Sequence, residues 1–486
     1  GMIMIHCRDG THNWEVFHRS LGANWPINLN SPNTARNDST VWNNTSPTSS
    51  VFTVGTSSNV NQNGHGYVAY VFAHDDQSFG ADQDEAIIKC GYYAGTGASQ
   101  EINLGFEAQW LLVRNNSGAT NWFMVNNMMG DKSVVADESS AEVDNSYGFD
   151  GFRANGFALT GGNANFNSNG SAYIYMAIRR PHKPPTAGTE VFAAQASRSA
   201  ADGTPSELTY TSNFPVDLMF NLGRAGNSLN MVTVDRLRGQ SAYLATSQTN
   251  AENTSGPWKL DTNAGVYLNG NFGATSDHGG LMFRRAPGFF DVVAYTGTGS
   301  AASFSHNLKA TPQLLIHKSR EATNSWVVFT TVIDGTMDYT YLNGQNQTGN
   351  SSSGLPTSSV FNVSSGAIIN ASGGTFIAYL FATLDGISKV GTYSGTGNDI
   401  NVDCGFTAGA RFVLIKRTDS SGDWYIWDTA RGIVSGNDPY LLLNSTAAEV
   451  TNTDYIDPLN AGFTVTSSAP SALNTSGGTY LFLAIA

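Results

Sequence analysis

Cysteines, histidines and carboxylates are the side chains of this chain that could hold a metal ion or carry catalysis. Its three cysteines, Cys7, Cys90 and Cys404, form neither a CxxC pair nor an even framework. Zinc sites and disulfide scaffolds both need such spacing, so neither is predicted. The three thiols are instead predicted to act as small, partly buried hydrophobic side chains.

The only closely spaced histidines are His6, His12 and His18. On a strand, their six-residue spacing would put them on one face but about 20 Å apart, too far for a shared metal. Structural or surface roles are therefore predicted for all three. No metal-binding residue is assigned from the sequence.

An acidic stretch at 75–85 could gather oxygen ligands around calcium. Its carboxylates are Asp75, Asp76, Asp82, Asp84 and Glu85. They lack the fixed spacing and the central glycine of a calcium loop. A solvated linker is therefore the favoured interpretation, with calcium binding as the alternative.

The glycine-rich segment GTYSGTG at 391–397 raises the question of a phosphate-binding loop. Nucleotide loops need GxGxxG before a helix, or GxxxxGK followed by Ser or Thr, and neither pattern is present. A strand-like run, DINVDCGF, follows instead. The segment is predicted to be a turn in the opening hairpin of a β-sandwich, and no cofactor is predicted.

Four tryptophans, Trp14, Trp122, Trp326 and Trp424, could stack on sugar rings. They occupy corresponding points of apolar strands, so a core role is favoured over a lectin-like one. Paired carboxylates for glycoside cleavage need not be near in sequence. However, no segment carries an acid cluster that the others lack, so no catalytic residue is assigned and the chain is not expected to be an enzyme. Ligand-binding residues stay unknown.

Composition excludes several classes of protein. Of the 486 residues 13% are charged, and the formal net charge of −13 arises from 38 acidic and 25 basic side chains. No basic run interleaved with aromatics is present, which argues against nucleic acid as a partner. The longest apolar runs are too short for a membrane helix, so membrane insertion is not expected. The first residues also lack the pattern of a secretory signal.

Internal repeats decide the predicted architecture. GYYAGTG (91–97), VAYTGTG (293–299) and GTYSGTG (391–397) recur with a period near 100, as do the four tryptophans. A divergent repeat lies between them; it lacks the GTG turn but keeps DRLRG (235–239), the counterpart of DTARG (428–432).

Short strands every ten to twelve residues, without helical periodicity, predict an all-β chain: a tandem array of antiparallel, jelly-roll-like β-sandwiches. The predicted repeats are a truncated repeat 1 (1–73), repeat 2 (86–180), the divergent repeat 3 (189–286), repeat 4 (289–382) and repeat 5 (388–486). Independent domains in a row are favoured over a closed ring. An exposed sheet edge is expected near residues 2–18 of repeat 1.

The chain carries a resemblance to a known family that covers essentially all of it, is strongest in repeats 4 and 5 and weakest in repeat 3, and is illustrated by repeat 5. Its RFVLIKRTDSSGDWYIWDTARG (411–432), PYLLLNSTAAEV (439–450), GFTVTSS (462–468) and SGGTYLFLAIA (476–486) resemble a repeat domain of unknown function found in virion proteins, often described as tail fibres, of marine and other bacteriophages. The family brings no catalytic residues. The DTARG phrase departs to VIDGT in repeat 4 and NNMMG in repeat 2, so a binding site in that loop would be lost there.

The resemblance implies a non-enzymatic virion protein, a tail-fibre or appendage part that presents loops for host attachment. Its partners would be other virion proteins and a glycan or receptor on the host surface. Homo-oligomerisation is a further expectation by analogy. The alternative is an adhesin or lectin-like carbohydrate-binding protein on a bacterial cell surface, followed by a glycan depolymerase.

Overall fold

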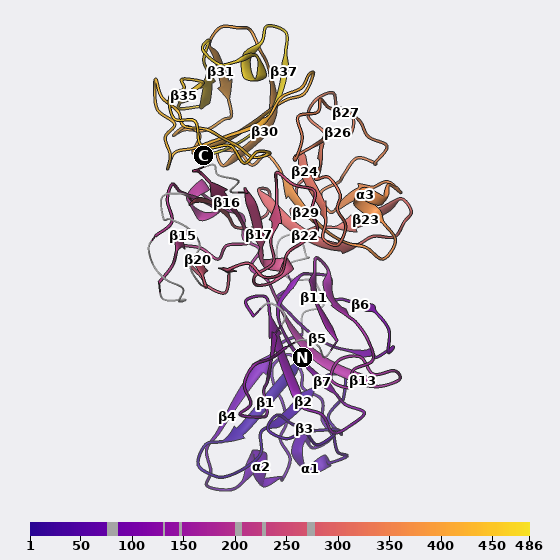
Figure 1. Ribbon diagram of the computed structural model, residues 1–486. Coiled ribbons are helices and arrows are strands. Elements are labelled where there is room, and N and C mark those ends of the chain that lie inside the picture. Colours follow the sequence, from indigo (N-terminus) through magenta and orange to yellow (C-terminus); the bar gives the residue numbers. More distant parts are fainter. Residues whose placement is uncertain (75–85, 130–131, 145–147, 200–206, 226–229, 270–277) are drawn as a thin grey trace. The chain divides into compact units, whose positions relative to one another are not determined.

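The computed structural model describes residues 1–74, 86–129, 132–144, 148–199, 207–225, 230–269 and 278–486 (Figure 1). The acidic stretch 75–85, for which calcium binding was the alternative to a linker, lies outside the described residues. The chain divides into two compact units, Gly1–Pro181 and His182–Ala486. Antiparallel strands dominate both units, which confirms the predicted all-β class.

Repeat 5 shows how one sandwich is built. Its larger sheet has the order β30-β37-β32-β33-β34, and its smaller sheet β31-β36-β35. The larger sheet contains β30 (Ser388–Ser394), β37 (Thr479–Ile485), β32 (Phe412–Arg417), β33 (Trp424–Asp428) and β34 (Leu441–Leu442). The smaller contains β31 (Ile400–Asp403), β36 (Gly462–Val465) and β35 (Ile456–Leu459), and α4 (Ser471–Asn474) precedes the last strand.

The GTG segment of repeat 5 is a turn, but it does not close a hairpin. The strands on either side, β30 and β31, belong to different sheets, so the turn carries the chain from one layer of the sandwich to the other. Gly397 has φ +76°, a conformation that favours glycine. The side chain of Asn474 accepts hydrogen bonds from the N–H groups of Thr396 and Gly397, both at 3.0 Å, which anchors the turn.

Repeats 4 and 3 follow the same strand order. Repeat 4 consists of β22 (Phe290–Thr296), β29 (Thr375–Phe381), β24 (Leu314–Ser319), β25 (Val327–Thr330), β26 (Asp338–Tyr341) and β27 (Gly349–Asn350), with β23 (Ala302–Ser305), β28 (Val360–Val363) and α3 (Ala367–Asn370). Repeat 3 consists of β14 (Phe192–Gln195), β21 (His278–Phe283), β16 (Leu218–Gly223), β17 (Val232–Asp235) and β18 (Leu244–Ala245), with β15 (Tyr210–Thr211), β20 (Gly265–Leu268), β19 (Trp258–Lys259), η1 (Gly188–Glu190) and η2 (Arg236–Arg238).

Repeats 3, 4 and 5 share one hydrophobic core in addition to their own. Alternate residues of β32 show the division: Phe412 and Leu414 join the shared core, while Val413 and Ile415 point into the sandwich. The shared core draws buried side chains from all three repeats, from Val191 to Ile485. Because the larger sheets are buried on both faces, their strands are almost continuously apolar. The expectation of independent domains in a row is therefore wrong for these three repeats.

Unit 1 holds repeats 1 and 2. Repeat 2 has the larger sheet β5 (Ile88–Ala94), β13 (Ala172–Arg179), β7 (Ala108–Asn115), β8 (Trp122–Asn126), β9 (Lys132–Val135) and β10 (Val143–Asp144), and the smaller sheet β6 (Gln100–Asn103), β12 (Gly156–Leu159) and β11 (Phe149–Arg153). Repeat 1 has one sheet of β3 (Ile27–Asn28), β2 (Glu15–His18), β1 (Met2–Cys7) and β4 (Tyr67–Phe72), with α1 (Ser39–Trp42) and α2 (Ser58–Asn61).

The exposed sheet edge of repeat 1 differs from the one predicted from the sequence. Strand β1 pairs on both sides, with β2 and β4, and β2 pairs with β1 and β3. Among the described strands β4 pairs with β1 alone, since the counterpart of β5 is absent from this sheet. Accordingly Tyr70 and Val71 of β4 are 49% and 61% exposed. The prediction of an exposed edge near residues 2–18 was wrong, because β1 and β2 lie inside the sheet and β4 forms its edge.

Candidate functional site

Three of the four repeated tryptophans join one repeat to the next. Trp122, Trp326 and Trp424 are buried. Their indole N–H groups donate to backbone carbonyls of the preceding repeat: Asn28 at 2.8 Å, Ala245 at 2.9 Å and Tyr341 at 3.0 Å. The predicted core role is confirmed for these three, and they are closed to sugar stacking.

Trp14 is different, since it is only half-buried. It stacks on His6 with ring centroids 4.5 Å apart, and its ring centroid lies 6.0 Å from that of Tyr70. These three rings come from β1, the loop before β2, and β4, on the sheet of repeat 1.

The DxxRG phrases and the pairs Ala251-Glu252 and Ala448-Glu449 form largely buried ion-pair chains between repeats. In repeat 3, Arg238 pairs with Asp235 and, at 3.3 Å, with Glu252. Glu252 then binds Arg320 of repeat 4 at 2.8 Å. In repeat 5 the same positions repeat the pattern: Arg431 binds Asp428 at 2.5 Å and Glu449 at 3.3 Å, and Glu449 binds Arg224 of repeat 3 at 2.6 Å.

The junction between repeats 4 and 5 keeps the backbone contact but has no charges at these positions. The N–H of Thr348 donates to the carbonyl of Thr418 at 2.9 Å. At the other two junctions the backbone N–H groups of Glu252 and Glu449 donate in the same way to the backbone carbonyls of Arg320 and Arg224. The strand register also aligns Thr330 with Asp235 and Asp428. At this junction the acids, the arginine and the partner arginine of the other junctions are therefore all replaced by uncharged residues. The contacts run from repeat 3 to 4, from 4 to 5, and from 5 back to 3, so these phrases join sandwiches and are not a loop presented to a ligand.

His18 occupies the corresponding position in repeat 1 and contacts repeat 2. Its Nε2 lies 3.0 Å from the carbonyl of Tyr175, and its Nδ1 accepts from the N–H of Ser20 at 3.2 Å. The ring is therefore the neutral tautomer with the proton on Nε2. Burial is the main cause that lowers the pKa of His18 to about 4. A structural role, as the sequence predicts, follows.

We expect acid to destabilise unit 1 through His18. Its folded pKa lies below the ordinary value near 6.5, so the unfolded chain takes up a proton first, and stability falls as pH drops from about 6.5 to about 4, by at most about 3 kcal/mol. His18→Gln should flatten that dependence. Hydrogen exchange of β1 and β2 amides at several pH values, corrected for intrinsic exchange rates, measures it. An unchanged pH slope in the variant would contradict the assignment.

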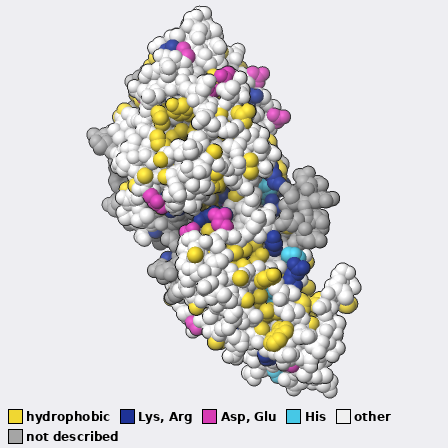
Figure 2. Space-filling view, turned by 90° about the vertical axis from the view of Figure 1, so that its right-hand side faces the viewer, with side chains coloured by type: hydrophobic (Ala, Val, Ile, Leu, Met, Phe, Trp, Pro, Cys, Tyr) yellow, Lys and Arg dark blue, Asp and Glu magenta, His cyan; other side chains and the backbone are white. Residues whose placement is uncertain are grey.

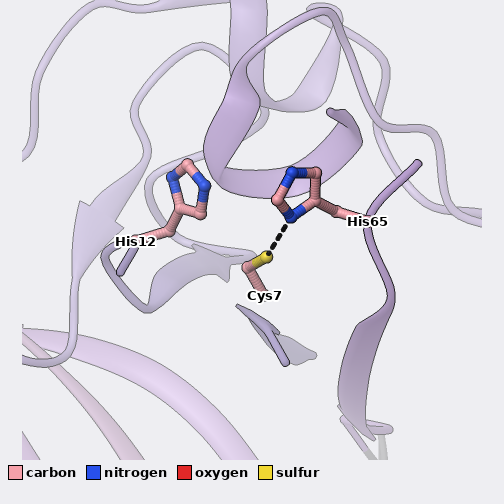
Figure 3. A group of neighbouring side chains, drawn as sticks. All are labelled: Cys7, His12 and His65. Atoms are coloured by element: carbon pink, nitrogen blue, oxygen red, sulfur yellow. Dashed lines mark hydrogen bonds between the residues drawn. The ribbon is translucent and has the colours of Figure 1, made fainter. Parts of the chain in front are cut away.

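A cysteine and two histidines meet at one end of the repeat 1 sheet (Figure 3). The ligand atoms of Cys7, His12 and His65 all lie within 4.8 Å of one another. Cys7 Sγ is 3.7 Å from His65 Nδ1, and Asp9 Oδ1 is 3.1 Å from that same nitrogen. The Gly66 N–H also donates to Asp9 at 3.1 Å, and this hydrogen bond is the main cause that lowers the pKa of the Asp9 carboxyl.

Sequence reasoning missed this cluster. It treated His6, His12 and His18 as one strand, whereas β1 ends at Cys7 and the chain turns back before β2, so His12 lies in a loop. His65 is 58 residues away from Cys7. The sequence does contain one signal for this cluster, which is His65 in NGHG (63–66). The matching turn of repeat 5, SGG (476–478), has a glycine in place of that histidine. All three cysteines are buried, but Cys90 and Cys404 fit the prediction better, because both pack within hydrophobic clusters. Burial raises the pKa of their thiols to about 11 and about 12.

Fold and junctions together define a tandem β-sandwich repeat protein whose sandwiches are joined through buried polar contacts. The chain belongs to the family described as a domain of unknown function, DUF7483, which matches residues 1–181 and 284–486. Almost all of repeat 3 lies in the unmatched part, yet its larger sheet has the strand order of repeat 5. No curated protein matches the chain. No solved structure matches it either. None of the helices in the described part of the chain is long and apolar enough to cross a membrane.

Proposed function

We propose that this chain is a non-enzymatic structural protein of a bacteriophage virion, part of a tail fibre or a comparable appendage that presents loops to a host surface. The observation that carries the proposal is the core shared by repeats 3, 4 and 5. Three sandwiches that bury a common core and exchange buried hydrogen bonds form one rigid body. Such a body suits a part that must withstand mechanical force, and the loops outside the junctions would make the contacts with the host.

The surface of the chain supports the same role. Figure 2 shows one face on which charged side chains are sparse and uncharged groups dominate. This agrees with the 13% charged residues of the sequence. The resemblance of repeat 5 to repeats of phage virion proteins points the same way. Mass spectrometry of purified phage particles should find this chain among the structural proteins; its absence from all virions of the source would count decisively against the proposal.

A lectin-like surface protein is the second candidate, and the half-buried Trp14 favours it. Its ring stacks on His6 and lies near the exposed Tyr70, an aromatic arrangement on which a sugar ring could stack. On a glycan array, Trp14→Ala should then abolish binding, while the control Tyr92→Ala, at a 71% exposed ring on another strand, should not. Absence of glycan binding by the parent chain would remove this candidate. A glycan depolymerase is the third candidate, and it would release reducing ends from host glycans.

A further inference from the structure

The cluster at the end of the repeat 1 sheet combines atoms that zinc prefers. Cys7 ends β1, His12 lies in the loop between β1 and β2, and His65 closes the turn that leads into β4. Figure 3 shows both imidazole rings flanking the thiol. A thiolate and two imidazoles are a donor set typical of zinc and other late first-row transition metals.

We propose that Cys7, His12 and His65, with Asp9 as the fourth ligand, form a binding site for a divalent transition metal ion, with zinc as the favoured ion. Cys7 Sγ, Asp9 Oδ1 and His65 Nδ1 form a triangle with sides of 3.4, 3.1 and 3.7 Å. One face of a tetrahedral zinc site, with Zn–S about 2.3 Å and Zn–N or Zn–O about 2.0–2.2 Å, has edges of about 3.3–3.6 Å. The three atoms already have nearly that spacing.

His12 supplies the fourth corner. Its Nδ1 lies 3.3 Å from Asn59 Oδ1 in α2, so the ring donates there and leaves Nε2 as the ligand atom. Gly10 faces this atom: a Cβ added to Gly10 would lie 2.9 Å from His12 Nε2 and 3.3 Å from Cys7 Sγ. The missing side chain at Gly10 therefore keeps open the space between the two ligands.

The donor set belongs to repeat 1 and not to the repeat fold as such. Strand register aligns Cys7 with Asn115, Ser319 and Arg417 of repeats 2, 4 and 5. The residue two positions before the repeated tryptophan is His12 in repeat 1, but Thr120, Asn324 and Gly422 in the others. The position of His65 holds Ser171, Gly374 and Gly478. The other sandwiches fold without these ligands, so the fold does not require them.

Binding would join three segments that are separate in the chain: the end of β1, the following loop and the turn into β4. The ion would replace the thiol proton of Cys7, so the affinity should fall as the pH is lowered. The site is a structural one in this interpretation, and it stands whether the chain is a virion protein or an adhesin.

Cobalt(II) is the probe for the test, because thiolate ligation gives it a charge-transfer absorption band. The full chain, stripped by a chelator, should bind one Co²⁺ with that band, and added Zn²⁺ should displace it. Cys7→Ser should lose the band, while the matched control Cys404→Ser, a buried cysteine of repeat 5, should retain it. Circular dichroism of each variant shows whether it is folded.

Two variants outside the ligand set sharpen the test. Asn59→Ala should weaken metal affinity by about 10- to 100-fold, as loss of a group that orients a ligating histidine does. Gly10→Ala should weaken it too, because the added Cβ enters the space between Nε2 and Sγ. A parent chain that binds no Co²⁺ with thiolate absorption, or a band that persists in folded Cys7→Ser, overturns the proposal.

Discussion

Arg238→Met should lower the free energy of unfolding of unit 2 by about 3–5 kcal/mol, as removal of one partner from a buried ion pair does. The side chain of Arg238 is fully buried with Asp235, and its Nη2 donates to the carbonyl of Thr233 at 2.9 Å. Burial alone would lower the pKa of Arg238, but Asp235, Tyr379 and Glu252 outweigh it and raise the pKa. The substitution would leave Asp235 and that carbonyl without this donor.

Chemical denaturation of the parent and the variant measures this loss. Arg417→Met is the matched control, because Arg417 pairs at 2.9 Å with Asp419 in the same unit and the two side chains are 15% and 36% exposed. A pair that water reaches contributes about 0–1 kcal/mol, so the control should cost much less than Arg238→Met. Equal effects of the two substitutions would contradict the role given to the buried chain of charges.

The junction between repeats 4 and 5 indicates how the buried charges of the junction between repeats 3 and 4 could be removed with a smaller loss of stability. Asp235, Arg238, Glu252 and Arg320 can all be replaced by the residues found at the junction between repeats 4 and 5, namely Thr, Ile, Thr and Thr, which removes the acids and the arginines of this ion-pair chain together. This fourfold variant should therefore cost less than Arg238→Met alone, because coupled residues do not add. Contacts that form a closed set of three junctions also explain why repeats 3, 4 and 5 share a core that no single repeat could bury.

Much of this fold could be predicted because it depends on local signals. The GTG turns, the tryptophans and the short apolar strands mark each sandwich, and they recur every hundred or so residues. The sequence even contains the residues of the junctions, since Asp428, Arg431 and Glu449 lie in phrases that it repeats. Their role could not be inferred, because a partner such as Arg224 is about two hundred residues away and only the packing of complete sandwiches brings it near.

The errors have physical reasons as well. The short apolar strands were interpreted as parts of independent sandwiches, but burial of strands such as Leu314–Ser319 on both faces means a second, shared core. His12 and His65 were missed because a loop reversal and a distant turn define their meeting point. The period of apolar residues indicates which face of a strand each side chain is on, but it does not indicate which strand ends lie close together in the fold.

The second large effect is expected at the junction between repeats 4 and 5, where a buried indole joins the two repeats and the charges of the other junctions are missing. Trp424→Ala should lower the free energy of unfolding by about 3–5 kcal/mol, since it empties a fully buried site in the shared core. Trp424→Phe should keep most of the packing but leave the carbonyl of Tyr341 without its 3.0 Å donor, at a cost of about 1–3 kcal/mol.

Trp427, three residues further along the same strand, is the control that separates packing from hydrogen bonding. It is equally buried, but it points into the repeat 5 sandwich, and its indole N–H has no hydrogen-bond acceptor among the described residues. Trp427→Phe therefore loses volume without losing a hydrogen bond, and removing an unsatisfied donor offsets part of that loss. Urea denaturation should show Trp424→Phe as the more destabilising of the two; the reverse order would mean that the bond to Tyr341 contributes less to stability than the packing lost at Trp427.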